Sequence, residues 1–428
     1  MKLALYWACG LSALALASSV PAEAQELTGT RTPLAALILE AESSNAAIAA
    51  AEDGWKAATH VAEQVKRLPD PQFSVQSFSV GSPKPFAGFS NSDFAYIGLG
   101  ASQELPYAGK LRLKGEVAER DAAMEKTKAE LVRWSITDEV KGLYLRLGYL
   151  EKTLSILGRD EAVLKPMIET ALARYSVGEG SETEVLKAQI EHTKILREIT
   201  EDEEERGQVE AGLKALLHRS QSTADIVPEP LTPTRLGRTA AELEGLVCGH
   251  NPAVSVESAD VHKQDARLRS AEREGKPDFN VGYTFEQTGG GYRDYYMLTV
   301  SMRLPRRKRV EAGVAEAAES LERSKQELDS EVQQQLAEVQ KQYVTVMSTE
   351  QLMKEYEEGL LPEARAEFEA ERAQYQSGQA GQAGGSGLAP VLASLLDVLK
   401  YEREYQQALL DHESAMARLE TLTGARLR

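Results

Sequence analysis

Cysteine and aromatic residues are scarce in this chain of 428 residues. It contains two cysteines, Cys9 and Cys248, and aromatic residues make up 6% of the sequence. Because Cys9 lies in an N-terminal segment that we expect to be removed, the rest of the chain cannot form an internal disulfide. Alanine, glutamate, leucine, lysine, glutamine and arginine are plentiful instead. That composition is typical of long helices rather than of a thick globular core.

Long apolar runs are missing after the first 24 residues. Lys2 is followed by an apolar run from Leu3 to Val20 and by Ala22-Glu23-Ala24, a small-residue cleavage pattern. Residues 1–24 are therefore predicted to be a signal peptide, with an uncleaved anchor as the alternative. No later segment is apolar for 18 residues, which excludes transmembrane helices from the rest of the chain. The export signal indicates a bacterial envelope protein or a secreted protein.

Catalytic and metal-binding motifs are also missing. The sequence has no nucleophile elbow, no phosphate-binding loop and no convergent acid–base pair, so we predict that the protein is not an enzyme and uses no cofactor. None of the six histidines pairs with another at helical spacing. His250 lies two residues from Cys248, which we interpret as a loop histidine and a loop thiol rather than a metal pair. The formal net charge of −17 argues against nucleic acid as a partner.

What the chain does contain is a tandem repeat with a unit of about 200 residues. Asn45 begins NAAIAAAEDGW and Asn251 begins NPAVSVESADV, and each Asn is followed at the same distance by a Phe in PQFSVQSFSV or PDFNVGYTFE. A Leu-Pro pair follows in each copy, and the copies end in ARYSVG and AQYQSG. We therefore divide the chain into a first repeat (25–218), an equatorial linker (219–249) and a second repeat (250–428).

Each repeat is predicted to contain one helix of about 70 residues. In the first, at 107–174, apolar residues step by three and four from Val140 to Tyr175 with Glu161 as the one polar interruption. This pattern is typical of a coiled-coil seam, and a helix of this length spans ~100 Å. Pro166 is expected to kink it near its far end. The second long helix is predicted at 306–376, with a looser seam and with a proline, Pro362, in a similar place.

Shorter segments are predicted to pack beside each long helix as two half-helices placed end to end. Asn45 and Asn251 are expected to cap the first half-helix of each repeat. The segments 25–44 and 219–249 would then lie as a belt at the midpoint. The expected half-helices are 46–67 and the return helix 182–218 in the first repeat, and 252–275 and the return helix 390–424 in the second.

Four segments switch to two-residue alternation, which predicts β-strands at 72–80, 94–104, 278–287 and 294–304. Each has about the length of a tilted membrane strand, with one apolar and one polar face. Four strands cannot close a barrel and an open sheet edge cannot face lipid, so a membrane sheet would require several chains to share one barrel. A soluble four-stranded sheet is the alternative. The side chains expected to face lipid are Tyr283, Phe285, Leu298, Val300 and Met302.

Basic residues follow the Leu-Pro pair of each repeat. Lys110, Arg112 and Lys114 follow Pro106, and the run 306–309 (RRKR) follows Pro305. Cations at this position would lie at the headgroup boundary of a membrane. Ordinary solvated helix starts are the alternative.

These features resemble the TolC-type outer membrane efflux channels, also called outer membrane factors. The matching residues are Asn251-Pro252, the Leu-Pro pairs at 105–106 and 304–305, and Arg174-Tyr175-Ser176-Val177-Gly178 followed by EVLKA at 184–188. The likeness covers essentially the whole chain after the signal peptide. It implies an α+β membrane protein, a homotrimer whose 12-stranded β-barrel lies in the outer membrane of a Gram-negative bacterium and continues as a periplasmic α-helical barrel.

The same resemblance implies partners and a passive mechanism. The channel would receive substrates from a periplasmic adaptor (a membrane fusion protein) and an inner-membrane pump of the RND type, and would be surrounded by outer membrane lipid. The compact length is similar to that of the CzcC and CusC metal-efflux channels, although the sequence leaves the substrate open between metal ions and drugs. The alternatives are a periplasmic adaptor, which would carry one hairpin within β-rich flanks, and a secreted coiled-coil protein, which would not need four amphipathic strands.

In that family the turns at the helix tips dock the adaptor. The matching residues here are Tyr175, Val177, Gly178 and Glu179, with Gly378 in the second tip. Ending a helix is the alternative role for Gly178. The second tip is six residues longer than the first and contains a glycine-rich insert at 378–387.

The acidic constriction found in relatives does not carry over to this chain. Pro390 and Ala393 stand where the acids are expected. Asp397, two helical turns beyond Pro390, is a candidate for a lumen constriction in a trimer, with a solvated helix charge as the alternative.

Overall fold

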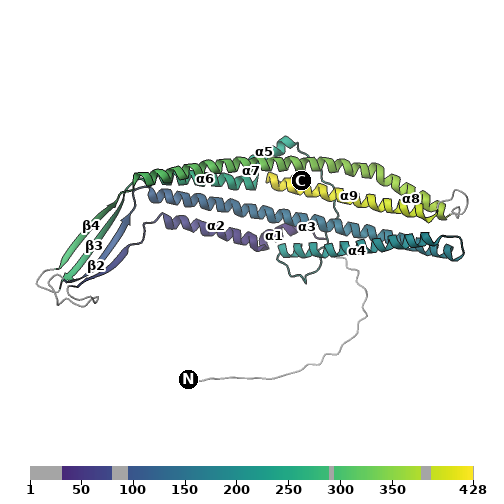
Figure 1. The fold of residues 1–428 in the computed structure, drawn as a ribbon, viewed down its shortest axis with the longest axis horizontal. Helices are drawn as coiled ribbons and strands as arrows, with labels where there is room; N and C mark the ends of the chain where they lie inside the picture. The colour runs from purple at the N-terminus through teal and green to yellow at the C-terminus, as the bar shows by residue number, and fades with distance from the viewer. Residues whose placement is uncertain (1–30, 80–94, 289–293, 377–386, 428) are drawn as a thin grey trace, which may run out of the picture.

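The computed structural model describes residues 31–79, 95–288, 294–376 and 387–427. The predicted signal peptide therefore lies outside the described residues, as do the hairpin turns, Gly378 and nearly all of the glycine-rich insert. The described chain is elongated, with the strands at one end and two helical tips at the other (Figure 1).

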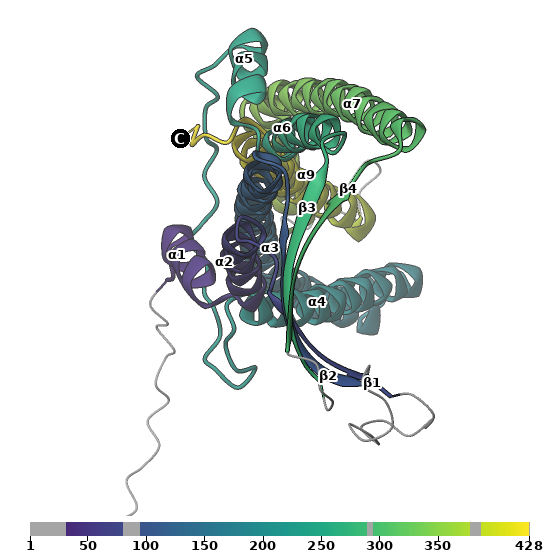
Figure 2. The ribbon, with the colours of Figure 1, turned by 90° about the vertical axis from the view of Figure 1, so that its left-hand side faces the viewer.

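The strands form one antiparallel sheet in the order β1-β2-β3-β4. Their bounds are Gln72–Phe78, Tyr96–Leu105, Asp278–Thr288 and Tyr295–Arg303, close to the predicted segments. Leu105 pairs with Phe279, so the last strand of the first repeat lies beside the first strand of the second repeat. The two hairpins thus merge into one sheet. Figure 2, which views the helices end-on, shows that this sheet extends away from them.

The long helix of the first repeat is α3, Lys110–Ser176. It begins three residues later than predicted because Gly109 adopts a left-handed conformation, with φ of 93°, which continues the turn after Pro106. α3 then runs through Pro166 as one helix of 67 residues.

The long helix of the second repeat is divided into three parts: α7 (Arg307–Glu355), a π-helical turn η1 (Tyr356–Leu360) and α8 (Leu361–Gln376). The π turn ends just before Pro362, which lacks an N–H and whose ring would clash with the carbonyl four residues earlier in a regular α-helix. A π turn relieves that conflict by shifting the hydrogen-bond pattern. The two repeats, which have a proline in similar places, therefore differ in how the helix passes it.

The half-helices are stacked end to end, as predicted. α2 (Ala46–Val65) and α4 (Glu182–Leu216) both pack along α3, while α6 (Pro252–Arg273) and α9 (Leu388–Thr423) pack along α7. Asn45 joins the first pair: its Oδ1 accepts from Ala47 N at 2.8 Å and its Nδ2 donates to Leu216 O at 2.9 Å.

Asn251 makes the same junction in the second repeat. Its Oδ1 accepts from Val254 N at 2.9 Å and its Nδ2 donates to Leu422 O at 2.8 Å. In each repeat the asparagine and the accepting residue are separated by 171 positions. The predicted caps are therefore confirmed, and each asparagine also holds the end of the preceding half-helix.

Two short helices, α1 (Leu34–Ser44) and α5 (Ala240–His250), lie near the middle of the long axis (Figure 1). We expected this region only as a belt, without these helices. Leu37 of α1 packs against Val140 and Leu147 of α3, and Val247 of α5 packs against Val339 of α7. Each helix ends directly before a capping asparagine. The two segments of the belt therefore occupy equivalent positions in the two repeats.

No single helix among the described residues has both the length and the apolar character of a membrane-crossing helix. One bent pair, α1 with α2 at 46°, meets those measures jointly.

Candidate functional site

The sheet has one mainly apolar face and one mainly polar face. Tyr283 lies opposite Ala101 on β2 and Leu298 on β4, and Leu99 lies opposite Val75 on β1 and Phe285 on β3. This register brings the apolar side chains of all four strands to one side. They are Phe73, Val75, Ile97, Leu99, Ala101, Leu105, Phe279, Val281, Tyr283, Phe285, Tyr296, Leu298, Val300 and Met302.

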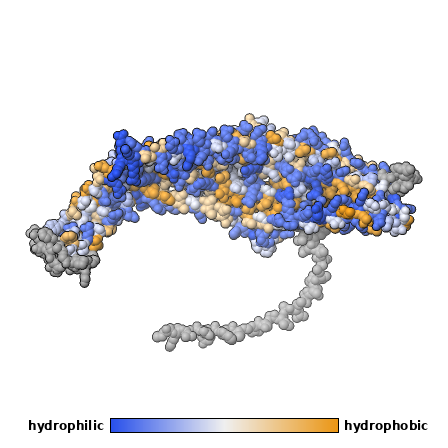
Figure 3. All heavy atoms as spheres, in the orientation of Figure 1, coloured by the Kyte–Doolittle hydropathy of each residue, from blue (hydrophilic) through white to orange (hydrophobic). Residues whose placement is uncertain are grey.

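The opposite face carries mainly polar side chains and glycines, among them Gln76, Ser102, Asn280, Thr299 and Ser301. The apolar face is open in the protomer, where Leu298 is 68% exposed and Val300 is 63% exposed. At the strand end in Figure 3, orange spheres are interspersed with white and pale blue ones. All five residues predicted to face lipid lie on this one face. Their contact with lipid stays a prediction.

The first strand-to-helix joint is held by a buried lysine. Lys110 Nζ lies 2.9 Å from Asp278 Oδ2 and 3.3 Å from Glu274 Oε2, and Asp278 Oδ1 accepts from Tyr107 N at 2.9 Å. Lys110 is only 2% exposed, so its charge requires these carboxylates. The start of α3 is thereby fixed to the region where α6 leads into β3, and the two repeats are joined at the base of the sheet.

At the other end, the first helical tip presents the residues predicted to dock an adaptor. Val177 is 70% exposed and Tyr175 is 44% exposed. Gly178 has φ of 79°, and its N–H donates to Tyr175 O at 3.1 Å while Glu179 N donates to Arg174 O at 2.9 Å. No other atoms lie within 4 Å of the position that a Gly178 side chain would occupy. Gly178 therefore does end the helix, and it also leaves open space at the tip.

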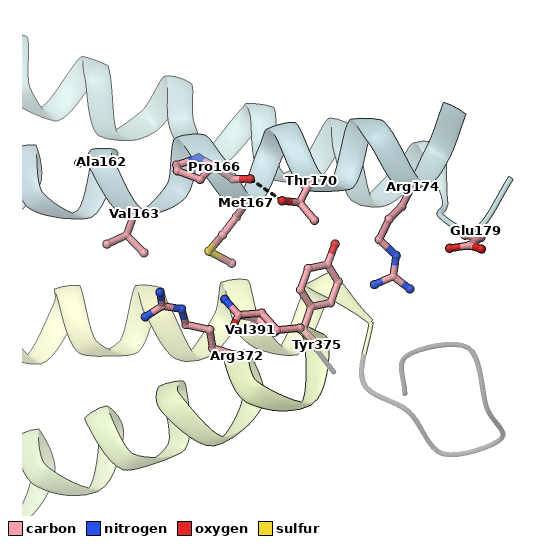
Figure 4. Close-up of a pocket in the computed structure, with 11 residues that line it drawn as sticks. Ala162, Val163, Pro166, Met167, Thr170, Arg174, Glu179, Arg372, Tyr375 and Val391 are labelled. Carbon is pink, nitrogen blue, oxygen red and sulfur yellow. Dashed lines mark hydrogen bonds between the residues drawn. The ribbon is translucent and has the colours of Figure 1, made fainter. Parts of the chain in front are cut away.

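The two tips are packed against each other through Arg174. Its guanidinium lies 5.0 Å from the ring centre of Tyr375, which is 7% exposed. A cleft of about 550 Å³ lies between the tips, with Val163, Met167 and Arg174 on one side and Arg372, Tyr375 and Val391 on the other (Figure 4). Tyr375 is thus part of the packing, although the equivalent Tyr175 is exposed.

Charged side chains tie the two helical hairpins together farther from the tip. Glu402 of α9 accepts hydrogen bonds from Arg159 of α3 and, at 2.6 Å, from Arg365 of α8. Arg403 of α9 pairs with Glu198 of α4. A single segment of α9 therefore contacts three other helices through ion pairs.

The pKa values of this cluster follow from burial and from the arginines. Burial of Glu402 acts to raise the pKa of its carboxyl, but the hydrogen bonds from Arg159 and Arg365 outweigh it and lower the pKa below its ordinary value. Burial dominates at Asp160 and raises the pKa of that carboxyl. Partial burial and the hydrogen bond that Tyr405 donates to Glu357 Oε1 at 2.5 Å raise the pKa of Tyr405 to about 12.

Sequence reasoning missed this cluster because its members are far apart in the chain. One signal was present: Glu402 continues the helical spacing of the buried residues Leu395, Val398 and Leu399 in α9. A charged residue at a seam position indicates a partner on a neighbouring helix. Asp397, by contrast, is exposed on α9, so its role in a constriction stays a prediction.

No group of three or more metal-binding side chains occurs within the part of the chain that the structure describes. Cys248 and His250 both lie in the last turn of α5 rather than in a loop as expected, and Cys248 is exposed. The arrangement as a whole offers an amphipathic sheet, an elongated helical body and an open tip.

The chain thus combines two strand hairpins with long paired helices. Residues 37–218, nearly all of the first repeat, match the family described as "Outer membrane efflux protein". The predicted resemblance to the TolC-type channels is thereby confirmed. Proteins of this family are channels and not enzymes, in agreement with the prediction. A comparison with curated proteins found no match.

Solved structures show the same fold over most of the chain. CusC, from a study of transmembrane channel formation, is 15% identical with a TM-score of 0.77, covering 92% of this chain and 93% of that one. The outer membrane protein VceC from Vibrio cholerae is 16% identical, with a TM-score of 0.76 and coverage of 92% and 97%. The MtrE outer membrane channel from Neisseria gonorrhoeae is 19% identical, with a TM-score of 0.72 and coverage of 92% and 89%.

Proposed function

We propose that the protein is the outer membrane channel of a tripartite efflux system. Three protomers would each contribute four strands to a 12-stranded barrel in the outer membrane of a Gram-negative bacterium. The helices would continue the tunnel through the periplasm. A periplasmic adaptor would dock at the tips, and an inner-membrane pump, of the RND type, would supply the energy for transport. The channel itself conducts passively, because its walls need no chemistry for that task.

The observation that carries this proposal is the sheet. Within the described residues, β1 and β4 each pair on one side only, and most large side chains of the apolar face are exposed. Unpaired edges and an apolar face are both unfavourable in water, and unpaired edges are also unfavourable in lipid. Closing the sheet with further copies in a membrane satisfies the edges by pairing and the apolar face by lipid.

Fractionation combined with heat-modifiability separates the proposal from its alternatives. We expect the protein in the outer membrane fraction, migrating on a gel as an oligomer until the sample is heated. An adaptor would instead give a chain associated with the periplasm or inner membrane, and a secreted coiled coil would appear in the medium. Either of these, or a chain that runs as a monomer without heating, contradicts the channel. Growth of a deletion strain on metal salts, dyes and antibiotics then identifies the substrate.

A further inference from the structure

The two strand-to-helix joints carry similar numbers of cations but differ in how these are neutralised. In the first, Lys110 and Lys114 pair with Glu274, and Arg112 lies 3.7 Å from Glu116. In the second, Arg307 pairs with Glu311 at 2.6 Å. The other three basic residues of the run 306–309 form no ion pair among the described residues. The repeat thus has one neutralised joint and one that retains excess positive charge.

Two of those unpaired cations line a cleft of about 550 Å³. Arg306 and Arg309 form its wall with Arg303, which pairs with Glu104 at 3.1 Å. The carboxylates of Glu274 and Asp278 also line it, but both are already bonded to Lys110. The guanidinium groups of Arg306 and Arg309 are therefore available for an external anion. The deepest blue surface in Figure 3 lies over the start of α7, where this run is found.

The cleft adjoins the end of β4, whose last residue is Arg303. Leu304 and Pro305 line the cleft itself, and Leu304 is 67% exposed. Met302 and Val300 follow on the apolar face of β4, and both are more than half exposed. A ligand that fits this surface has an anionic head for the arginines and an apolar tail for the strand. Free phosphate would use only the first of these features.

We infer that Arg306 and Arg309 in this cleft bind the phosphate of an anionic phospholipid of the periplasmic leaflet, with an acyl chain along β4. The inference rests on the proposed outer membrane location. Arginine forms bidentate hydrogen bonds with phosphate, and the pair would give one lipid site per protomer. The first joint would not form such a site because its cations already have partners.

Native mass spectrometry of the full-length protein in detergent tests the inference, with dioleoyl phosphatidylglycerol as the probe and dioleoyl phosphatidylcholine as the comparison. Arg306→Gln with Arg309→Gln should weaken phosphatidylglycerol binding about 30-fold, from ~1 kcal/mol for each basic residue near an anionic headgroup. Arg307→Gln with Lys308→Gln is the matched control. It removes the same charge from the same run but outside the cleft, and should change binding less than about threefold.

Several outcomes would overturn the inference. Equal weakening in the two double variants would mean a diffuse surface attraction, and equal affinity for both lipids would mean that the anionic head is not recognised. Displacement of the lipid by millimolar inorganic phosphate would mean a free-anion site. Loss of the oligomer in the Arg306 and Arg309 variant, with lipid binding retained per protomer, would assign these arginines to a neighbouring subunit. Fractionation of the unaltered protein is independent of all these results and tests the proposed function separately.

Discussion

Glu402 shows how one side chain can join helices that are distant in the sequence. Its two oxygens accept from Arg159 of α3 and Arg365 of α8, and its side chain is 7% exposed although the arginines are 51% and 59% exposed. The carboxylate is therefore the desolvated member of the cluster. Its charge is retained only because both arginines reach it. The contribution of Glu402 to stability must then depend on its ionisation.

We predict that protonation of Glu402 in acid lowers the stability of the folded protein. Its pKa in the folded protein lies below the ordinary value of 4.5, so the folded state binds its proton less readily than the unfolded state. The stabilisation is thus present above about pH 4.5 and lost as the pH falls through the lower, folded value. Asp160 has a raised pKa and acts in the opposite direction, so the comparison must be made with a variant.

Thermal unfolding of the detergent-solubilised protein at pH 7 and at pH 3 to 4 is the measurement. At pH 7, Glu402→Gln should lower the free energy of unfolding by about 1–2 kcal/mol, a value reduced because the arginines are exposed to solvent. On acidification, the variant should lose less stability than the unaltered protein. Glu358→Gln is the control, because Glu358 is 70% exposed and lies 3.9 Å from its partner Lys354. Identical acid responses in all three proteins would contradict the role of Glu402.

The capping asparagines show what a single sequence can and cannot reveal about a residue. An Asn before an apolar helical pattern predicts a cap, and Asn45 and Asn251 both cap helices. Their second bonds, to Leu216 O and Leu422 O, join segments 171 residues apart, which no local pattern encodes. The repeat could have suggested this bond, because a structural role shared by the two copies needs equivalent partners at equal spacing.

At the scale of elements, periodicity predicted the positions of the strands well but gave no information on their pairing. Two-residue alternation located β2, β3 and β4 and one face of each. It was less clear for β1, and only the pairing of Phe73 with Ala101 and of Val75 with Leu99 places these side chains on the apolar face. The helices show a similar limit. Pro166 and Pro362 looked equivalent, yet only the second is preceded by a π turn, because surrounding packing decides how a helix accommodates proline.

The sheet yields a matched pair of substitutions on neighbouring residues of β4. Leu298 lies on the apolar face opposite Tyr283, and Thr299 lies on the polar face opposite Gly282. Leu298→Arg should cost about 2–4 kcal/mol if its face contacts lipid near the bilayer centre, whereas Thr299→Arg would place the same charge in a water-filled lumen. We expect the first variant to lose most heat-resistant oligomer in the outer membrane and the second to keep it. Equal losses would mean that the apolar face is not the lipid face.

At the scale of the whole molecule, the two ends of the protomer impose different requirements. Among the described residues, the outer strands β1 and β4 pair on one side only and most of the apolar face is exposed, so the proposed channel would need further copies and a membrane at this end. The tip end is already packed, since Arg174 and Tyr375 join the two hairpins within one protomer. Substitutions at the strand end should therefore affect assembly. Substitutions at the exposed tip should affect the partner and leave assembly intact.

Gly178 allows that separation to be tested at the tip. Its φ of 79° makes any other residue strained by about 1–2 kcal/mol, and the space around it is open to a bulky side chain. Gly178→Trp adds both strain and bulk, while Gly178→Ala adds the same strain with almost no bulk. If an adaptor docks here, the Trp variant should form normal heat-resistant oligomers but lose efflux, measured as resistance of a complemented deletion strain.

The Ala variant decides between the two roles of Gly178. Efflux close to normal in Gly178→Ala, together with its loss in Gly178→Trp, would mean that the open surface is needed for contact. Equal loss in both would mean that the glycine only ends α3 and that backbone strain disturbs the tip. Normal resistance with the Trp variant would exclude docking at this turn. Because Val177, also on this turn, is 70% exposed, a bulky residue at 178 blocks a surface that the protomer itself does not use.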